Sequence, residues 1–243
     1  MPTTLITAVF GVLAASVLRG FIGFGFGLSA VPLLSLALPP TKVVPFVTIL
    51  QVLVGLTGLR EAWRLTNWRA VLGLAPGLIL GVPLGLFLLT ELPANRARLA
   101  IGLLIAVSVA GLARNLRLPA RPSRGVTLAA GILSGTMNGL ASMGGPPIVV
   151  YLLASSSDAA VVRATSIVYF LVAAVVTAVP MAARGLVDRE VLLWSLASIP
   201  VLAAGSWLGT WAFQRAGARF HRFTALAVLT VLAVALIGRS LVF

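Results

Sequence analysis

The stretch Ser134-Gly-Thr-Met-Asn138-Gly-Leu-Ala-Ser142-Met-Gly144-Gly145-Pro146-Pro147 lies inside a hydrophobic run, yet it has the composition of a loop. Two adjacent glycines leave the backbone loose and two adjacent prolines remove two amide donors, so no ordinary helix continues through residues 144–147. At membrane depth, backbone groups freed in this way must find partners in protein or water. We therefore expect a helix break that is buried in protein or lines a cavity.

The composition of the whole chain is typical of an integral membrane protein. Of its 243 residues, 60% are hydrophobic and only 9% are charged, whereas soluble domains carry roughly 25% charged residues. The net charge is +13, but the arginines lie between apolar segments, so we assign them to membrane topology and expect no nucleic-acid partner. The chain has no cysteine and no cluster of metal-ligating residues, and we expect neither a metal site nor a cofactor.

Ten apolar segments can be drawn along the chain, five in each half. They span residues 3–18, 21–38, 43–59, 69–90 and 97–113 in the first half, and 125–138, 141–154, 161–182, 191–213 and 223–243 in the second. The short segments, below the ~20 residues that cross a bilayer at right angles, fall in pairs as the first two of each half. Each pair meets at a glycine cluster, which is residues 20–27 in the first half and the stretch quoted above in the second. We therefore expect broken or re-entrant helices at these two pairs.

The two halves are similar to each other in sequence. Prolines and glycines recur at equivalent positions, pairing Pro32 with Pro147, Gly81 with Gly205 and Gly85 with Gly209. Shared glycine and proline at equivalent depth favour a duplicated unit. We predict an all-α polytopic membrane protein with two inverted-topology repeats, residues 1–118 and 119–243, in one integral membrane domain.

The placement of charge predicts the orientation of the segments. Three loops are the most basic; they carry Arg60, Arg64 and Arg69, then Arg114, Arg117, Arg121 and Arg124, then Arg215, Arg219 and Arg222. The turn with Lys42 is nearly neutral, and Asp188 and Glu190 balance the loop with Arg184 and Arg189. If the basic loops lie in the cytoplasm, successive loops fall on alternating sides of the membrane, provided that the chain enters and leaves each pair of short segments on the same side. Either two full crossings or a re-entrant hairpin meets this condition. The halves are then inverted, and both termini lie outside a cell (inner) membrane.

Two motifs carry a resemblance to a known family. The glycine-rich run that ends in Ala30-Val31-Pro32-Leu33-Leu34, and Gly144-Gly145-Pro146-Pro147 after Asn138, resemble the sulfite exporter TauE/SafE family of membrane permeases. The resemblance covers essentially the whole chain. It implies export or import of a small sulfur-containing or organic anion, such as sulfite, sulfoacetate or another sulfonate.

An anion inside a membrane requires hydrogen-bond donors and positive potential at mid-depth, which backbone amides at the N-termini of broken helices provide. The candidate donors are the amides of Gly23, Gly25 and Gly27 with Ser29 at the first break, and the amides of Gly144 and Gly145 with the side chains of Thr136, Asn138 and Ser142 at the second. The prolines expected to interrupt the helices are Pro32, Pro146 and Pro147. The alternative is that these glycines only let helices approach closely.

Five further residues are candidates near the breaks. Arg19 either faces the anion as a fixed guanidinium donor or lies at the membrane surface where the first segment ends. Thr48 and Gln51 lie one helical turn apart, as do Ser166 and Tyr169. These pairs either complete the substrate site, with Gln51 and Tyr169 contacting the anion, or only make hydrogen bonds between helices.

Acidic residues lie only at or beyond the segment ends, so no carboxylate proton relay is expected. One of them, Asp158, is expected to cap the helix that follows it. The hypothesis is a permease, and not an enzyme, that moves a small anion through the bilayer by alternating access between two inverted halves. The alternatives are an anion channel and, from another class, a membrane enzyme or assembly subunit. A second copy of the chain, in a homo-oligomer, is a further candidate partner.

Overall fold

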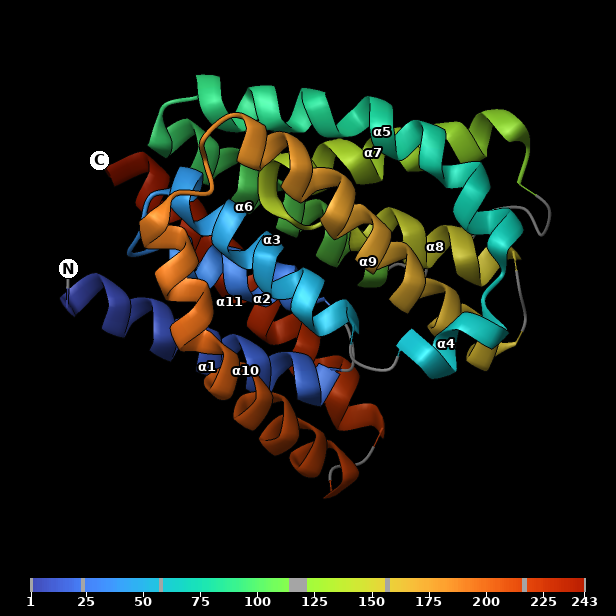
Figure 1. Ribbon diagram of the computed structural model, residues 1–243. Coiled ribbons are helices and arrows are strands. Elements are labelled where there is room, and N and C mark those ends of the chain that lie inside the picture. The colour runs from blue at the N-terminus through green and yellow to red at the C-terminus, as the bar shows by residue number, and fades with distance from the viewer. Residues whose placement is uncertain are drawn as a thin grey trace.

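The computed structural model describes residues 2–22, 25–56, 59–113, 122–155, 158–215 and 218–242, and this part of the chain contains helices and no strand (Figure 1). The eleven helices are α1 (Pro2–Ile22), α2 (Phe26–Ser35), α3 (Pro40–Leu56), α4 (Leu59–Leu65), α5 (Trp68–Glu91), α6 (Ala94–Ala113), α7 (Arg124–Ala141), α8 (Gly145–Ser155), α9 (Ala159–Ala183), α10 (Arg189–Arg215) and α11 (Ala218–Val242). The all-α prediction is confirmed.

Each of the ten apolar segments drawn from the sequence corresponds to one helix, and α4 is an additional short helix within a basic loop. Asp158 caps α9 as expected, because its Oδ1 accepts the N–H of Ala160 at 2.8 Å. The expected boundary between the halves, after residue 118, lies outside the described residues.

Among the described residues, four helices, α5, α6, α9 and α10, are long and apolar enough to cross a membrane. A fifth span results if α3 and α4, which are bent by 71° relative to each other, are counted together. Shorter apolar stretches lie in α1, α2, α8 and α11. Large apolar side chains such as Phe10, Val107 and Leu196 are about two-thirds exposed on the outside of the bundle, as lipid-facing residues are. The chain is therefore a multi-pass membrane protein.

The most extensive helix contact in the described part of the chain is between α5 and α7 (Figure 1). Both helices place glycine at every fourth position along the contact, namely Gly77, Gly81 and Gly85 on α5 and Gly131, Gly135 and Gly139 on α7. A Cβ atom added at Gly81 would lie 2.2 Å from the carbonyl oxygen of Ile132, and one at Gly135 would lie 2.4 Å from that of Leu78. These separations leave no room for a side chain, so the two backbones touch directly.

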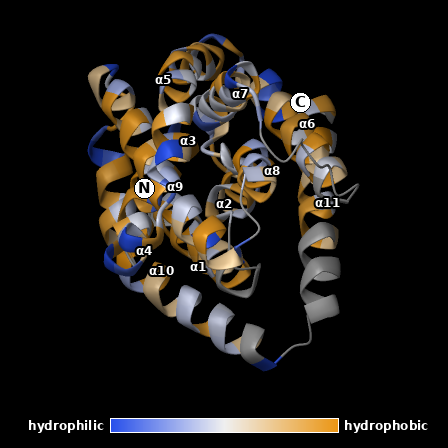
Figure 2. Cartoon of the chain, turned by 90° about the vertical axis from the view of Figure 1, so that its right-hand side faces the viewer, coloured by the Kyte–Doolittle hydropathy of each residue, from blue (hydrophilic) through white to orange (hydrophobic). Residues whose placement is uncertain are grey.

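The two shortest apolar helices, α2 and α8, lie in the middle of the bundle, with α6 and α11 on one side and α3 and α9 on the other (Figure 2). Nine of the ten residues of α2 are buried. Around this centre, α1 packs against α10, α3 against α9, and α6 against α11. The structure thus places Gly27 of the first glycine cluster, and the second cluster, inside the protein.

The basic loops lie at one end of the bundle, and the more balanced connections lie at the other. At one end lie α4, the start of α5, the start of α7 and the end of α10, which flank the basic loops; at the other end lie the start of α1, the end of α11 and the turn between α9 and α10. At this second end Lys42 Nζ forms ion pairs with Asp188 and with Glu190, the latter at 3.3 Å.

The ion pair links the first half of the chain to the second and is stable at neutral pH. Hydrogen bonds from Lys42 and from the N–H of Val191 hold the pKa of Asp188 below its ordinary value. A lowered carboxyl pKa means that the contact is present at neutral pH and is lost as the pH falls through that lowered pKa. The ion pair therefore joins the start of α3 to the start of α10 throughout the physiological range.

Replacing Gly81 with leucine should separate α5 from α7, because the new side chain meets the backbone of Ile132 and Thr136. We expect a loss of about 3 kcal/mol in the free energy of unfolding, measured as a lower thermal unfolding midpoint in detergent. Gly238→Leu on α11 is the control, because nothing lies within 4 Å of a Cβ at Gly238. Equal unfolding midpoints for the two variants would contradict backbone contact as the cause.

Candidate functional site

The quoted stretch forms the connection between α7, which ends at Ala141, and α8, which begins at Gly145. Ser142 has φ 51°, in the left-handed region, and is the one non-glycine residue with positive φ in the described part of the chain. Its N–H donates to the carbonyl of Asn138 at 2.7 Å and ends α7. A serine holds this conformation only when its surroundings fix it.

Side chains from α3 fix Ser142. The Ser142 hydroxyl is hydrogen-bonded to the Thr48 hydroxyl, and both hydroxyls lie close to the carbonyl oxygen of Val44, at 3.2 and 2.8 Å respectively. The Gln51 side-chain amide donates to the Ser142 carbonyl at 2.7 Å. Thr48 and Gln51 therefore act together on one face of α3, as their spacing predicts.

Side chains from α7 and α9 fix Gly144. The N–H of Gly144 donates to Asn138 Oδ1 at 3.3 Å, and its carbonyl accepts from the Ser134 hydroxyl at 2.7 Å. The Asn138 amide nitrogen in turn donates to Thr177 Oγ1 at 2.8 Å and to the Ala173 carbonyl at 3.1 Å. The Ser142 carbonyl and both backbone groups of Gly144 are thus satisfied by protein partners.

Tyr169 joins this network through its hydroxyl, which donates to Ser134 Oγ at 3.1 Å. Its sequence partner Ser166 does not, because the Ser166 hydroxyl donates at 2.8 Å to Val162 in its own helix. The network also contains Thr177, which the sequence-based site does not include. Thr177 lies eight residues after Tyr169, so both residues lie on one face of α9. This spacing is the signal in the sequence that could have identified Thr177 as part of the network.

Gly27 of the first glycine cluster meets the second cluster inside the bundle. Gly25, with φ 78°, precedes α2, and Gly27 in the first turn of α2 lies against the break. A Cβ atom at Gly27 would lie 2.0 Å from the carbonyl oxygen of Ser142 and 2.5 Å from Gln51 Nε2. Only glycine allows this approach, so Gly27 and Ser142 bring residues predicted from two separate breaks into contact.

Other predicted residues lie around this contact. The Ser29 hydroxyl donates to the carbonyl of Phe26 at 3.1 Å, with the Ala15 carbonyl at 3.4 Å. A Cβ at Gly145 would lie 3.6 Å from the Phe170 ring, so Gly145 has ordinary space around it. Thr136 is half-buried, and its carbonyl oxygen lies against Gly85 in the contact between α5 and α7. Gly23 lies outside the described residues.

The prolines take two different positions. Pro146 and Pro147 lie in the first turn of α8, where their missing N–H groups have no intrahelical acceptor. Pro32, expected as a break residue, lies inside α2 and does not end it. The helix starts at Phe26 because Gly25 supplies the left-handed residue there.

Arg19 lies in the last turn of α1, and its Nη1 donates to Ser206 Oγ of α10 at 3.3 Å. This contact ties the guanidinium to the packing of α1 on α10. No charged side chain is fully buried among the described residues, so the interior polar groups are neutral hydroxyls and amides. The same part of the chain holds no cluster of three or more metal-ligating residues.

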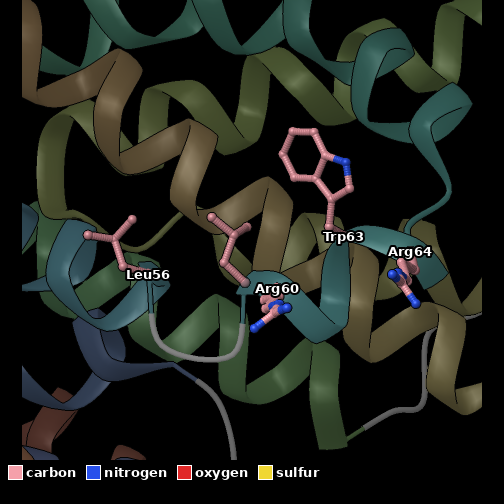
Figure 3. Close-up of a pocket in the computed structure, with 5 residues that line it drawn as sticks. Leu56, Arg60, Trp63 and Arg64 are labelled. Atoms are coloured by element: carbon pink, nitrogen blue, oxygen red, sulfur yellow. The ribbon is translucent and has the colours of Figure 1, made fainter.

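A separate cavity of about 480 Å³ opens on the surface where α3 is followed by α4 (Figure 3). Its walls are Leu56, Leu59, Arg60, Trp63 and Arg64. None of these residues belongs to the network around the break. The cavity and the break are therefore distinct features.

Eleven described helices with apolar faces and a buried, neutral polar network define a multi-pass α-helical membrane protein. Residues 7–236, nearly the whole chain, match the family model described as Sulfite exporter TauE/SafE. The chain belongs to this family of membrane transporters, which confirms the resemblance drawn from its glycine and proline motifs. No curated protein and no solved structure matches the chain.

Replacing Asn138 with alanine should destabilise the break, because Gly144 N–H, the Ala173 carbonyl and the Thr177 hydroxyl all lose a buried partner. We expect the free energy of unfolding to fall by about 2–4 kcal/mol, measured from thermal unfolding in detergent. Ser166→Ala is the control and should change it by less than about 1 kcal/mol, because that hydroxyl bonds only within its own helix. A small effect of Asn138→Ala would mean that the network does not hold the break.

Proposed function

We propose that the protein is a permease that moves a small anion, of the class of sulfite, a sulfonate or a related organic anion, by alternating access between two inverted halves. The observation that carries the proposal is the meeting of Gly27 with Ser142 inside a transporter of this family. Sites of many secondary transporters lie where discontinuous helices meet between inverted repeats. The substrate class rests on the family description.

The packing of the helices supports two inverted repeats. If α1, α2, α3, α5 and α6 correspond to α7, α8, α9, α10 and α11, then the contact of α1 with α10 corresponds to that of α7 with α5. The contacts of α2 with α3 and of α8 with α9 correspond in the same way. The contacts of α3 with α9 and of α6 with α11 each join a helix to its own counterpart, as contacts on a two-fold axis do. This pattern is the one expected for repeats of residues 1–118 and 119–243.

The ends of the bundle support the proposed orientation. The helix ends that flank the basic loops lie together at one end, which we assign to the cytoplasm of a cell inner membrane (Figure 1). The start of α1 and the end of α11 lie at the opposite end, so we place both termini outside. The ion pairs of Lys42 also belong to this outer end.

We place the anion at the N-terminal ends of α2 and α8. The first-turn amides of α2, at Phe26, Gly27 and Leu28, have no intrahelical acceptor and carry the positive end of the helix dipole. In α8 only Gly145 offers such an amide, because prolines occupy the next two positions. The proposed donors are therefore mainly the amides of α2.

The polar side chains of the network position these donors. Gln51, Asn138, Ser142 and Tyr169 are engaged with other protein groups, so their contribution to binding is mainly to hold Ser142 and Gly144 in place. Arg19 remains the one candidate full charge near the breaks, and its bond to Ser206 makes it a link to α10 as well. Neutral donors suit a permease because they bind an anion without trapping it.

The proposal is tested with purified protein in liposomes, by comparing the flux of sulfite and of a small sulfonate with that of phosphate and chloride. We expect saturable, selective flux of sulfite or the sulfonate. Selective flux that does not saturate would favour an anion channel. No selective flux of any of these anions would overturn the proposal.

Gly27→Ala should impair this transport, because the added methyl group would displace the Ser142 carbonyl and Gln51 amide. An overpacking cost of about 1–3 kcal/mol corresponds to a fall of about 5- to 150-fold in transport rate or affinity. Gly125→Ala in the first turn of α7 is the matched control, since only Ser123 Oγ, 3.9 Å away, lies near its Cβ. Full flux in Gly27→Ala would mean that transport does not depend on this contact.

A further inference from the structure

The short helix α4 has a composition that fits neither water nor the membrane interior. It leaves α3 at an angle of 71° and carries Arg60 and Arg64 one turn apart, which places them on the same side of the helix. The apolar side chains of Leu56 and Trp63 beside them are 55% and 54% exposed. Exposed arginines next to exposed apolar side chains are typical of a helix at the surface of a bilayer.

The helix is held in this position by its other face. Ala62 is buried in the cluster that α4 forms with α9, and Leu59 packs on the same cluster. The Trp63 and Trp68 rings pack edge to face with centroids 4.4 Å apart, which anchors α4 to the start of α5. The exposed side of α4 is therefore presented by a fixed scaffold.

The arginines have no protein partner in the part of the chain that the structure describes. The ion pairs found there involve only Lys42 with Asp188 and Glu190, and no hydrogen bond from Arg60 or Arg64 is present. Glu61 lies between them in sequence and forms no ion pair with either. Two guanidinium groups at the rim of an apolar cavity are thus available to a ligand outside the protein.

We propose that the cavity formed by Leu56, Leu59, Arg60, Trp63 and Arg64 binds the phosphate headgroup of an anionic phospholipid (Figure 3). Arg60 and Arg64 donate hydrogen bonds to the phosphate oxygens, as arginine does at phosphate sites. Leu56 and Leu59 contact the first carbons of an acyl chain, and Trp63 lies at the headgroup level, where tryptophan is enriched.

A lipid is favoured over a free anion because of this combination of surfaces. A free phosphate would use the arginines but leave the apolar wall in water, whereas a phospholipid covers both. The cavity also lies at the end of the bundle assigned to the cytoplasm, where arginines near a membrane attract anionic lipids. This location rests on the proposed orientation, but the binding itself does not depend on transport.

The test is lipid binding to the purified full-length protein in detergent, measured by native mass spectrometry with phosphatidylglycerol and phosphatidylcholine as probes. Two arginines near a lipid surface, at about 1 kcal/mol each, correspond to a preference of about 10- to 30-fold for phosphatidylglycerol. Arg60→Gln with Arg64→Gln should lower binding of phosphatidylglycerol to the level of phosphatidylcholine. Undiminished binding by this double variant would overturn the proposal.

The matched control is Arg184→Gln with Arg189→Gln, which removes two exposed arginines at the other end of the bundle. It should retain the lipid preference, and an equal loss in this control would mean that only net charge matters. Inorganic phosphate added at millimolar concentration should not displace the lipid; full displacement would assign the site to a free anion and overturn the lipid assignment.

Two measurements keep the test decisive if the glutamine variant does not fold. Arg60→Lys with Arg64→Lys preserves charge but not the paired donors, and it should keep only part of the preference. In the unmodified protein, the preference should fall as salt is raised, because the arginines are exposed. A preference that does not change with salt would contradict binding through these arginines. Because flux is not measured, failure here leaves the transport proposal intact.

Discussion

The direct contact of the α5 and α7 backbones is the constraint on which the arrangement of the other helices depends. Lipid tails are as apolar as leucine, so helices in a membrane associate through close packing. Glycine at every fourth position on both helices allows that approach, and a Cβ at any of these positions would meet a backbone atom of the partner helix. Because α7 ends in the break, its attachment to α5 also fixes where the break lies.

The second constraint is the absence of water at membrane depth. Ending α7 at Ala141 frees backbone groups that must be satisfied inside the protein. Gln51 of α3 donates to the Ser142 carbonyl, and Ser134 and Asn138 of α7 bond the carbonyl and the N–H of Gly144. Tyr169 and Thr177 of α9 in turn bond the side chains of Ser134 and Asn138. The polar side chains that the sequence predicts as a site are thus engaged in holding the backbone of the break. In the proposed site, the donors to the anion are the backbone amides at the helix ends.

The two glycine clusters have different roles in this arrangement. Hydroxyl and amide groups from both halves gather on the second cluster, at Ser142 and Gly144, whereas the first cluster contributes Gly27, which admits the Ser142 carbonyl. The proposed two-fold relation of the helices therefore does not extend to their chemistry. Substrate recognition and the response of each half to it are accordingly expected to differ, although their helices pack in corresponding pairs.

The sequence by itself determined the membrane class, the family, all ten long or paired apolar helices and the Asp158 cap, because hydropathy, glycine, proline and capping act over a few residues. Only the tertiary structure decided that Gly27 touches Ser142, that Asn138 bonds Thr177, and that Arg19 reaches Ser206. It also decided that Pro32 continues a helix and that α4 forms within a basic loop. These features depend on which helices become neighbours, and local sequence patterns do not specify contacts between segments that are distant along the chain.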